Sequence, residues 1–541
     1  MKIPYIEKGN QGGIDFYHNA KDNSRIFLYV YFFCIIIFFF VLLLRLFQLT
    51  VVKGAYYSKR SEQNRIREIL IEPKRGTITD RKGFILAENR EPDVYAPGTR
   101  ITSSRVYYDA EPFAHVIGYR GMAGDSDFSK DSCDNKLKLG DKIGKKGVEK
   151  LYDCELRGKS GKKLIEVDAK GRMVKALSVL NQQQGQTLQL AIDKDLQKVA
   201  YELIKGHRAV VVGLKPHTGE VLVLASAPSF DSQAFENIDN AALTKYFSDE
   251  SKPMFNRATE GTYPPGSTFK ITMATAALEE KKIDEATLIE DTGTLKAGTR
   301  DFGNWYYLEH GKKEGMVDIV KALQRSNDIF FYQIGGKLGP INIKSWSEKF
   351  GFGRKTGLGI DEVAGTIPSP FWKEDILKEK WYTGDTYNMS IGQGYILTTP
   401  LQVAQMTNIM ASDGYLCEPI LRKVSGDTKP DCKKLPISEK TLQTIKKGMV
   451  AACTPGGTAW PMFNFKVSEA TGSAQMQTAC KTGTAESHGE KTKPHAWFTI
   501  YAPAENPEIT LTVMFEEEGQ GSDVAAPVAR DVLKAYFNRK Q

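Results

Sequence analysis

The sequence lacks a second long apolar run, an internal repeat and any closely spaced pair of cysteines. None of its seven cysteines stands in a CxxC spacing, which excludes a zinc ribbon and a thioredoxin-type redox motif. Zinc-finger and RNA-binding signatures are missing too, so we expect no nucleic-acid partner. Neither sign of charge dominates, because 73 basic and 65 acidic residues leave a net charge of +8 over 541 residues. Such a modest excess is typical of a solvated surface.

One apolar run is present, from Ile26 to Leu44, and it contains no charged residue. At 1.5 Å per residue it covers roughly 28 Å, about the thickness of a bilayer core. A cleaved signal peptide is the alternative, but the run is longer than a usual signal h-region and no small-x-small cleavage site follows it. We expect a cytoplasmic tail at 1–25, a transmembrane anchor at 26–48 and an exported body. Because basic residues lie on both flanks, the positive-inside rule does not assign the orientation.

The remaining chain divides into two parts of different character. Its composition, 41% hydrophobic and 26% charged, is that of a folded globular protein. The polar part, 50–190, is rich in Lys, Gly and Asp, and its stretch from Arg120 to Lys146 is predicted to be an exposed loop. Near Leu188 the pattern changes to alternating apolar residues and then to helical periodicity. We therefore expect at least two globular units.

The second part begins and ends with predicted strands. Apolar runs bounded by turn residues predict strands at 209–214, 220–226, 496–501 and 509–515. Helical and amphipathic patterns predict helices at 195–204 and 524–537. Between them the pattern is mainly helical. Strands at both ends of a domain, with helices between, indicate one sheet built from those two ends.

Six of the cysteines lie in the body, and an even number in an exported domain allows disulfides. Cys417 with Cys432 and Cys453 with Cys480 are weak candidate pairs. Free buried thiols fit the sequence at least as well.

The segment 263–270, YPPGSTFK, is the most informative for chemistry. Pro and Gly fix a turn, and a helical pattern follows at once, so Ser267 is predicted at a helix N-terminus with Lys270 one turn away. A serine hydroxyl needs a base, and a buried lysine with a lowered pKa can serve. A capping serine followed by a surface lysine is the ordinary alternative. A second SxxK copy at Ser160 lies in a polar run and is discarded.

Two further motifs follow in order. Ser326-Asn327-Asp328 precedes an apolar helical run and could by itself be a simple helix cap. Lys481-Thr482-Gly483-Thr484 precedes the strand-like HAWFTIY and could hold a carboxylate at a strand edge. A competing Lys355-Thr356-Gly357 lies in a glycine-rich loop, so the later copy is favoured.

In this order, the three motifs resemble the active-serine set of penicillin-binding proteins and β-lactamases. Residues 75–89 and 143–161 resemble the pedestal of class B penicillin-binding proteins, and 256–268 and 381–402 resemble the elongation type, penicillin-binding protein two. The resemblance implies an α+β chain with a single N-terminal transmembrane helix and an elongated β-rich pedestal at 49–190. It places at 191–541 a transpeptidase domain with an antiparallel five-stranded sheet flanked by helices.

The resemblance also implies roles for the motif residues. Ser267 would attack the penultimate D-Ala carbonyl of a peptidoglycan stem peptide, with Lys270 as base. Ser326 and Asp328 would relay a proton to the leaving D-Ala. In the third motif, Lys481 and Thr482 would bind the substrate carboxylate and help hold Lys270 neutral. Gly483 would line the substrate site. The backbone amides of Thr484 and Ser267 would form the oxyanion hole.

Some relatives of this type carry a zinc site made of two Asp, a His and a Cys. Asp291, Asp301 and His310 could match three of these ligands, but Asn327 stands where the cysteine would be. Three oxygen and nitrogen ligands without a thiolate make a weaker site, so no metal or other cofactor is expected.

The function implied is a serine-type D-Ala-D-Ala transpeptidase or carboxypeptidase of cell elongation in the bacterial inner membrane, with a periplasmic catalytic domain. Its partners would be stem peptides, β-lactam inhibitors, a membrane glycosyltransferase of the SEDS family and other elongation-complex proteins. The alternatives are a septal class B transpeptidase, a membrane-anchored β-lactam sensor, and a scaffold with the same fold.

Overall fold

The computed structural model describes residues 20–90, 100–101, 103–168, 170–426, 430–466, 476–487 and 492–538. Most of the expected cytoplasmic tail, 1–19, lies outside this range. The chain separates into two compact units, of which the first comprises 1–71, 96–101 and 161–181, and the second 72–95, 102–160 and 182–541. The domain boundaries expected after residues 48 and 190 follow the family resemblance and stay predictions.

The first unit contains the apolar run. It lies in α1 (Ala20–Phe47), which continues through a π-helical turn, η1 (Gln48–Val52), into α2 (Gly54–Arg65). Among the described residues, one helical segment is long and apolar enough to cross a membrane: Arg25–Val52, with a hydropathy of 3.0 and no burial in its most apolar window. This exposure suits a lipid-facing anchor rather than a core helix.

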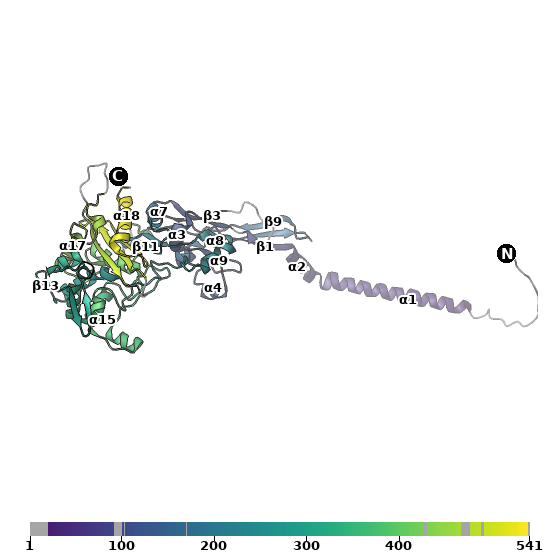
Figure 1. Cartoon of the computed structure of the whole chain (residues 1–541). Helices are drawn as coiled ribbons and strands as arrows, with labels where there is room; N and C mark the ends of the chain where they lie inside the picture. The colour runs from purple at the N-terminus through teal and green to yellow at the C-terminus, as the bar shows by residue number, and fades with distance from the viewer. Residues whose placement is uncertain are drawn as a thin grey trace, which may run out of the picture. The chain divides into compact units, whose positions relative to one another are not determined.

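A four-stranded sheet completes the first unit (Figure 1). Its strand order is β4 (Arg100–Ile101), β1 (Ile66–Ile71), β8 (Gly161–Val167) and β9 (Met173–Leu180). β1 pairs antiparallel with β8 along its whole length.

The second unit begins with the sheet β10 (Leu188–Gln189), β2 (Ile78–Thr79), β3 (Ile85–Arg90) and β5 (Ser104–Tyr107). The prediction of an exposed loop from Arg120 to Lys146 is wrong for the two ends of this stretch, whereas 131–141 contains no helix or strand. β6 (Arg120–Met122) pairs with β7 (Lys142–Gly144), α4 (Asp125–Lys130) lies between them, and the Arg120 side chain is buried. The Lys, Gly and Asp residues of this stretch form ion pairs and turns. Composition alone does not distinguish such a folded segment from a solvated loop.

The five-stranded antiparallel sheet is confirmed, and it is built from both ends of its domain. Its order is β12 (Val221–Ala227), β11 (Ala209–Leu214), β21 (Ile509–Phe515), β20 (His495–Ala502) and β19 (Ala479–Ala485). Ala209 pairs with Phe515 and Leu214 with Thr510, which joins segments some three hundred residues apart. The third motif lies on β19, the edge strand beside β20.

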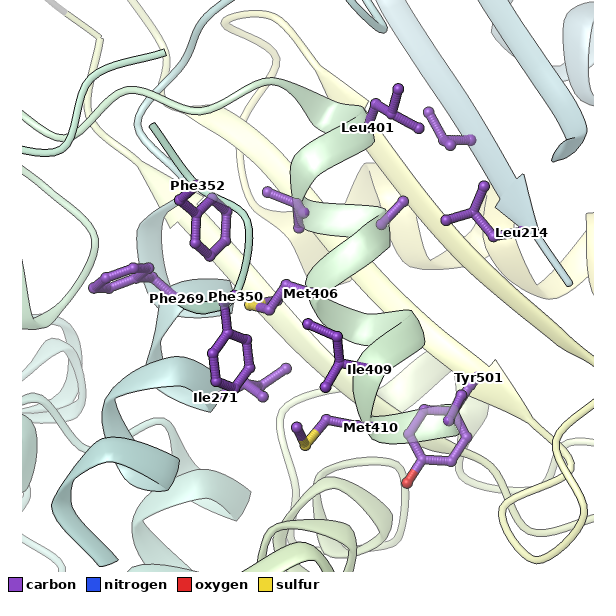
Figure 2. Packing of buried hydrophobic residues seen from close by; sticks show 14 of the residues in the cluster. Leu214, Phe269, Ile271, Phe350, Phe352, Leu401, Met406, Ile409, Met410 and Tyr501 are labelled. Atoms are coloured by element: carbon purple, nitrogen blue, oxygen red, sulfur yellow. The ribbon is translucent and has the colours of Figure 1, made fainter. Parts of the chain in front are cut away.

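Helices cover both faces of this sheet. α7 (Lys194–Ile204) and α18 (Ala526–Asn538) pack on one face through one apolar cluster, and α16 (Pro400–Ala411) packs on the other. Every residue of α16 is buried. Figure 2 shows Met406 and Ile409 of α16 close to Phe350 and Ile271, between the sheet and the helices that carry the first two motifs. The core thus supports the backbone of the candidate site.

The second unit also contains the following shorter strands and further helices: α3 (Ala110–Ile117), α5 (Gly147–Leu151), α6 (Asp153–Leu156), α8 (Ser232–Asn237), α9 (Asn240–Ser248), η2 (Gly266–Phe269), α10 (Lys270–Glu279), β13 (Ile289–Asp291), β14 (Thr294–Ala297), β15 (Arg300–Gly303), α11 (Trp305–His310), β16 (Gly315–Val317), α12 (Ile319–Arg325), α13 (Asp328–Lys349), α14 (Pro370–Trp372), η3 (Lys373–Leu377), α15 (Thr383–Ser390), β17 (Tyr415–Cys417), β18 (Cys432–Lys434), α17 (Glu439–Ala452), η4 (Trp460–Met462) and η5 (Gly521–Ala525).

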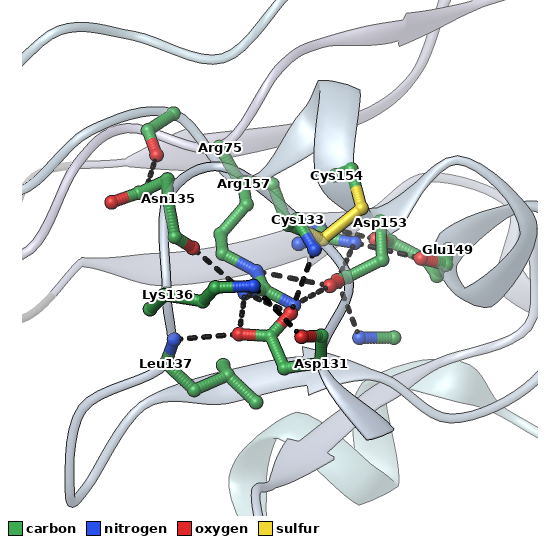
Figure 3. Close-up of a disulfide and its surroundings, with 12 residues drawn as sticks. Arg75, Asp131, Cys133, Asn135, Lys136, Leu137, Glu149, Asp153, Cys154 and Arg157 are labelled. Atoms are coloured by element: carbon green, nitrogen blue, oxygen red, sulfur yellow. Dashed lines mark hydrogen bonds and ion pairs between the residues drawn. A yellow bond between two sulfur atoms is a disulfide. The ribbon is translucent and has the colours of Figure 1, made fainter. Parts of the chain in front are cut away.

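Three disulfides join the six cysteines of the body. Both weak candidate pairs form, and the third bridge joins Cys133 to Cys154 (Figure 3). The alternative of free buried thiols is therefore wrong, and Cys34, within the anchor, is the free cysteine.

Candidate active site

The turn before α10 carries Ser267. Residues 266–269 form the 3₁₀ turn η2, and α10 begins at Lys270, as the sequence predicts. Gly266 has a φ of +53°, and a Cβ there would lie 2.8 Å from the carbonyl oxygen of Thr484. Only glycine combines this conformation with so close an approach. The turn carrying the serine therefore lies directly against the strand carrying the third motif.

The second motif lies between two helices. α12 ends at Arg325, Ser326 adopts the left-handed conformation with φ +55°, and α13 begins at Asp328. Asn327 caps α13, because its side-chain oxygen accepts a hydrogen bond from the Phe330 amide at 2.9 Å. The capping role that SxN could have by itself is thus real. The side chains of Ser326 and Asp328, on either side of Asn327, contact Lys270 of α10.

Lys270 joins the first two motifs. Its side chain is fully buried, and its Nζ donates to the carbonyl oxygen of Ser326 at 2.8 Å, to Ser326 Oγ at 3.3 Å and to Asp328 Oδ1 at 2.6 Å. A lysine held this way has a fixed Nζ position beside a hydroxyl and a carboxylate, an arrangement that can pass a proton between groups.

The third motif places a second lysine in the interior. Lys481 is fully buried on β19, and its Nζ donates to the carbonyl oxygen of Thr482 at 3.0 Å. The Thr482 hydroxyl lies 2.7 Å from that of Thr458, whereas Thr484 is exposed. Cys480, the residue before Lys481, is bonded to Cys453 at the end of α17. Two links therefore hold β19 on either side of Lys481.

Burial makes both lysines easier to deprotonate. Loss of solvation lowers the pKa of Lys270, although the charge of Asp328 opposes the change. Burial and then the charge of Lys270 lower the pKa of Lys481 well below its usual range. Both shifts favour loss of a proton from these amines, which is what activation of a serine hydroxyl requires.

The structure gathers the predicted residues in the expected way. Lys270, Ser326 and Asp328 are in direct contact, and Lys481 interacts electrostatically with Lys270. Ser267 lies on the turn that meets β19. The two discarded copies lie elsewhere: Ser160 precedes β8, and Thr356 bonds to Glu362 in its own loop. The catalytic and substrate-binding roles stay predictions.

The three considered zinc ligands do not gather around a common point. Asp291 is buried and its carboxylate accepts only N–H donors, while Asp301 and His310 are exposed. Among the described residues, no cluster of three or more His, Cys, Asp or Glu could hold a metal. The residues present therefore do not fit the zinc site of the resemblance.

Two residues that support the site were missed by the sequence analysis. The Asn304 side-chain oxygen accepts from the Asp328 amide at 3.1 Å, and the Trp305 amide donates to Asp328 Oδ2 at 3.0 Å. Asn304 immediately precedes α11, so an Asn before a helical run was the one available signal. That signal gives no hint of its contact with the second motif.

Two family models match the chain. One, described as the penicillin-binding protein transpeptidase domain, matches residues 209–534, and the penicillin-binding protein dimerisation domain matches residues 92–190. The chain is 31% identical to the peptidoglycan D,D-transpeptidase MrdA of Haemophilus influenzae, over 92% of this chain and 89% of that one. It is 33% identical to MrdA of Acinetobacter baumannii, over 82% of this chain and 67% of the other.

Solved structures agree with these relatives. Pseudomonas aeruginosa PBP2, in complex with WCK 5153, matches with a TM-score of 0.75 and 31% identity over 87% of this chain and 96% of the other. Helicobacter pylori PBP2, in complex with MreC, matches with a TM-score of 0.74 and 26% identity over 88% of this chain and 99% of the other.

Proposed function

The chain belongs to the penicillin-binding protein transpeptidase family, and from that premise we propose that it is an elongation-type peptidoglycan D,D-transpeptidase working through an acyl-enzyme on Ser267. The observation that carries the proposal is the buried Lys270, held by Ser326 and Asp328 one turn from Ser267. The relatives named MrdA and the PBP2 structures favour the elongation type over the septal alternative.

Acylation follows from this geometry. Ser267 Oγ attacks the carbonyl carbon of the penultimate D-Ala, and its proton passes to the unprotonated Nζ of Lys270. The amides of Ser267 and Thr484 stabilise the oxyanion. When the peptide bond breaks, the leaving amine of the terminal D-Ala takes a proton by way of Ser326 Oγ, while Lys481 and Thr482 bind its carboxylate.

The acyl-enzyme is then resolved by an amine of a neighbouring stem peptide, which forms the cross-link and frees Ser267. If water takes the place of the amine, the same enzyme acts as a D-Ala-D-Ala carboxypeptidase. β-Lactams acylate the same serine. No step needs a metal or other cofactor.

The disulfides support an exported body. Disulfides persist in oxidising compartments such as the periplasm, and all three lie C-terminal to the anchor. The proposed topology is an inner-membrane anchor at 26–48 with the catalytic domain in the periplasm. The three disulfides therefore favour a periplasmic catalytic domain, whereas the charges on the two flanks of the anchor favour neither orientation.

The proposed partners are a membrane glycosyltransferase of the SEDS family and other proteins of the elongation complex. Two relatives support this: the H. pylori PBP2 structure contains MreC, and another match, 27% identical with a TM-score of 0.74, is described as a peptidoglycan synthase complex that coordinates polymerisation and crosslinking.

Labelling with a fluorescent penicillin tests the enzyme function. The full-length wild type should label covalently, and Ser267→Ala should not. Ser160→Ala, which removes the serine of the other SxxK copy, is the matched control and should label like the wild type. Equal labelling of wild type and Ser267→Ala would refute the acyl-enzyme.

Replacement of the chromosomal copy tests the role in elongation. Ser267→Ala should cause rod cells to round up and should lower peptidoglycan cross-linking. Normal rods with normal cross-linking would contradict the elongation assignment, whereas filaments with intact side walls would support the septal alternative.

A further inference from the structure

Asp291 ends strand β13, is 2% exposed, and accepts hydrogen bonds from four N–H donors. Its Oδ1 accepts from the Gly293 amide at 2.9 Å, and its Oδ2 accepts from the Asn304 side chain at 2.9 Å, the Glu314 amide at 2.9 Å and the Asn327 side chain at 3.0 Å. A carboxylate has about four lone-pair positions. Three of the four donors bind Oδ2, so a metal ion at that oxygen would have to displace N–H groups, and only Oδ1 keeps a lone-pair position.

The donors connect this carboxylate to the catalytic machinery. Asn327 lies between Ser326 and Asp328, so its amide ties the second motif to β13. Asn304 makes a second tie, because its nitrogen donates to Asp291 while its oxygen accepts from the Asp328 amide at 3.1 Å.

The contacts continue to the base of the proposed reaction. The Trp305 amide donates to Asp328 Oδ2 at 3.0 Å, and Asp328 Oδ1 accepts from Lys270 Nζ at 2.6 Å. The path from Asp291 through Asn304 and Asp328 to the lysine thus runs through buried hydrogen bonds, and the part-buried Trp305 contact holds Asp328 from a second side. Such contacts fix donor and acceptor positions more firmly than exposed ones do.

We infer that Asp291 is a positioning residue, which holds Ser326 and Asp328 in the reactive geometry through the amides of Asn327 and Asn304 without a metal ion. In this chain Asn327 occupies the position of the second motif at which the zinc site considered above would have a cysteine. A carboxylate bonded to amides does the positioning. This inference rests on the proposed acyl-enzyme function.

Asp291→Asn is the central variant. Asparagine keeps the size of the side chain but turns an N–H₂ group toward at least one of the amides that now donate to it. The acylation rate constant for a fluorescent penicillin should fall about 10- to 100-fold, as expected for slight misplacement of reacting groups. The noncovalent affinity for the penicillin should stay within about twofold, since Lys481 and Thr482 are untouched.

A donor–acceptor exchange provides the rescue. In the double variant Asp291→Asn/Asn327→Asp, the new amide can donate to the new carboxylate, and Asp still caps α13. The rate should recover in part, to a value between those of Asp291→Asn and the wild type, because the N–H groups of Asn304 and Glu314 still face the new amide. A merely destabilised fold would instead be worsened by a second substitution.

The metal alternative is tested on the same full-length protein. Treatment with a zinc chelator should leave the wild-type rate within about twofold, as should Asp301→Asn and His310→Ala, which remove the other two considered ligands. A chelator-induced loss restored by added zinc would overturn the inference, and so would an Asp291→Asn rate equal to the wild type. Failure of the proposed function looks different, because the wild type itself would then label no better than Ser267→Ala.

Discussion

Removal of the charge of Glu149 tests the buried ion cluster of the second unit. Glu149 lies on α5 with its side chain fully buried, and its carboxylate accepts from Arg75 Nε at 2.5 Å and Arg105 Nε at 2.8 Å. Both guanidinium groups are also buried, and Figure 3 shows Glu149 near Arg75 and Asp153 beside the Cys133–Cys154 disulfide. Glu149→Gln keeps the shape but leaves two buried cations without this counter-charge.

The magnitude follows from the pKa of Glu149. Burial alone would raise that pKa, but Arg105 and Arg75 outweigh burial and hold it at about 2, below the ordinary value of 4.5. At about 1.4 kcal/mol per pKa unit, the difference amounts to about 3 kcal/mol of folding stability. This value is comparable to the roughly 3–5 kcal/mol by which removal of one partner of a buried ion pair lowers the free energy of unfolding. Because the folded-state pKa is lowered, this stability is present above pH 4.5 and is lost as the pH falls toward about 2.

Urea unfolding of the full-length chain in detergent, followed by tryptophan fluorescence and limited proteolysis, measures the effect. At neutral pH, Glu149→Gln should lower the free energy of unfolding by about 3 kcal/mol, and the difference from the wild type should shrink as the pH falls below 4.5. Glu155→Gln is the matched control, since its ion pair with Arg422 is 40% exposed on each side and should matter by less than about 1 kcal/mol. Equal effects of the two substitutions would refute the reasoning.

Three other predictions concern the site and its support. Asp328→Asn removes the carboxylate that opposes the lowering of the Lys270 pKa, so the midpoint of the pH–rate profile for penicillin acylation should move to lower pH; a midpoint that stays in place or rises contradicts this. Replacement of Cys453 and Cys480 by alanine opens a loop of 27 residues and should lower the free energy of unfolding, measured in urea, by about 3.5 kcal/mol. Acylation should also be slower, because β19 is held less firmly. An unchanged free energy of unfolding would show that the disulfide is dispensable. Met406→Ala should cost about 2–5 kcal/mol, because Met406 is fully buried between sheet and helices, and a change in thermal midpoint too small to detect would count against that packing.

Local sequence patterns were enough to locate the catalytic motifs. The spacing of Ser267 and Lys270 is set by one helical turn, and the cap at Asn327 is set within three residues. The strand at 509–515 matches its predicted bounds because it is a β-branched and apolar run that is buried along its whole length and preceded by Pro507. Each of these features depends on neighbours in the sequence, so the sequence carries the signal.

Long-range contacts were the part that could not be predicted. The buried state of Arg120 depends on Glu236, 116 residues away, and Asn304 meets Asp328 across 24 residues. Composition assigned Arg120 to an exposed loop, because a lysine- and glycine-rich stretch looks the same whether or not a distant carboxylate pairs with it. Residue type alone likewise made Asp291 a candidate metal ligand, although its fold neighbours supply N–H donors.

The order of strands in the five-stranded sheet has a consequence for how the protein is made. β11 pairs with β21, β21 with β20 and β20 with β19, so the strand bearing Lys481 joins the rest of the sheet only after residues 509–515 have been synthesised. Pairing over such sequence distances is slow, since loop closure precedes any gain from contact. A nascent chain that has not yet reached residues 509–515 therefore lacks the strand that connects Lys481 to the N-terminal half of its sheet.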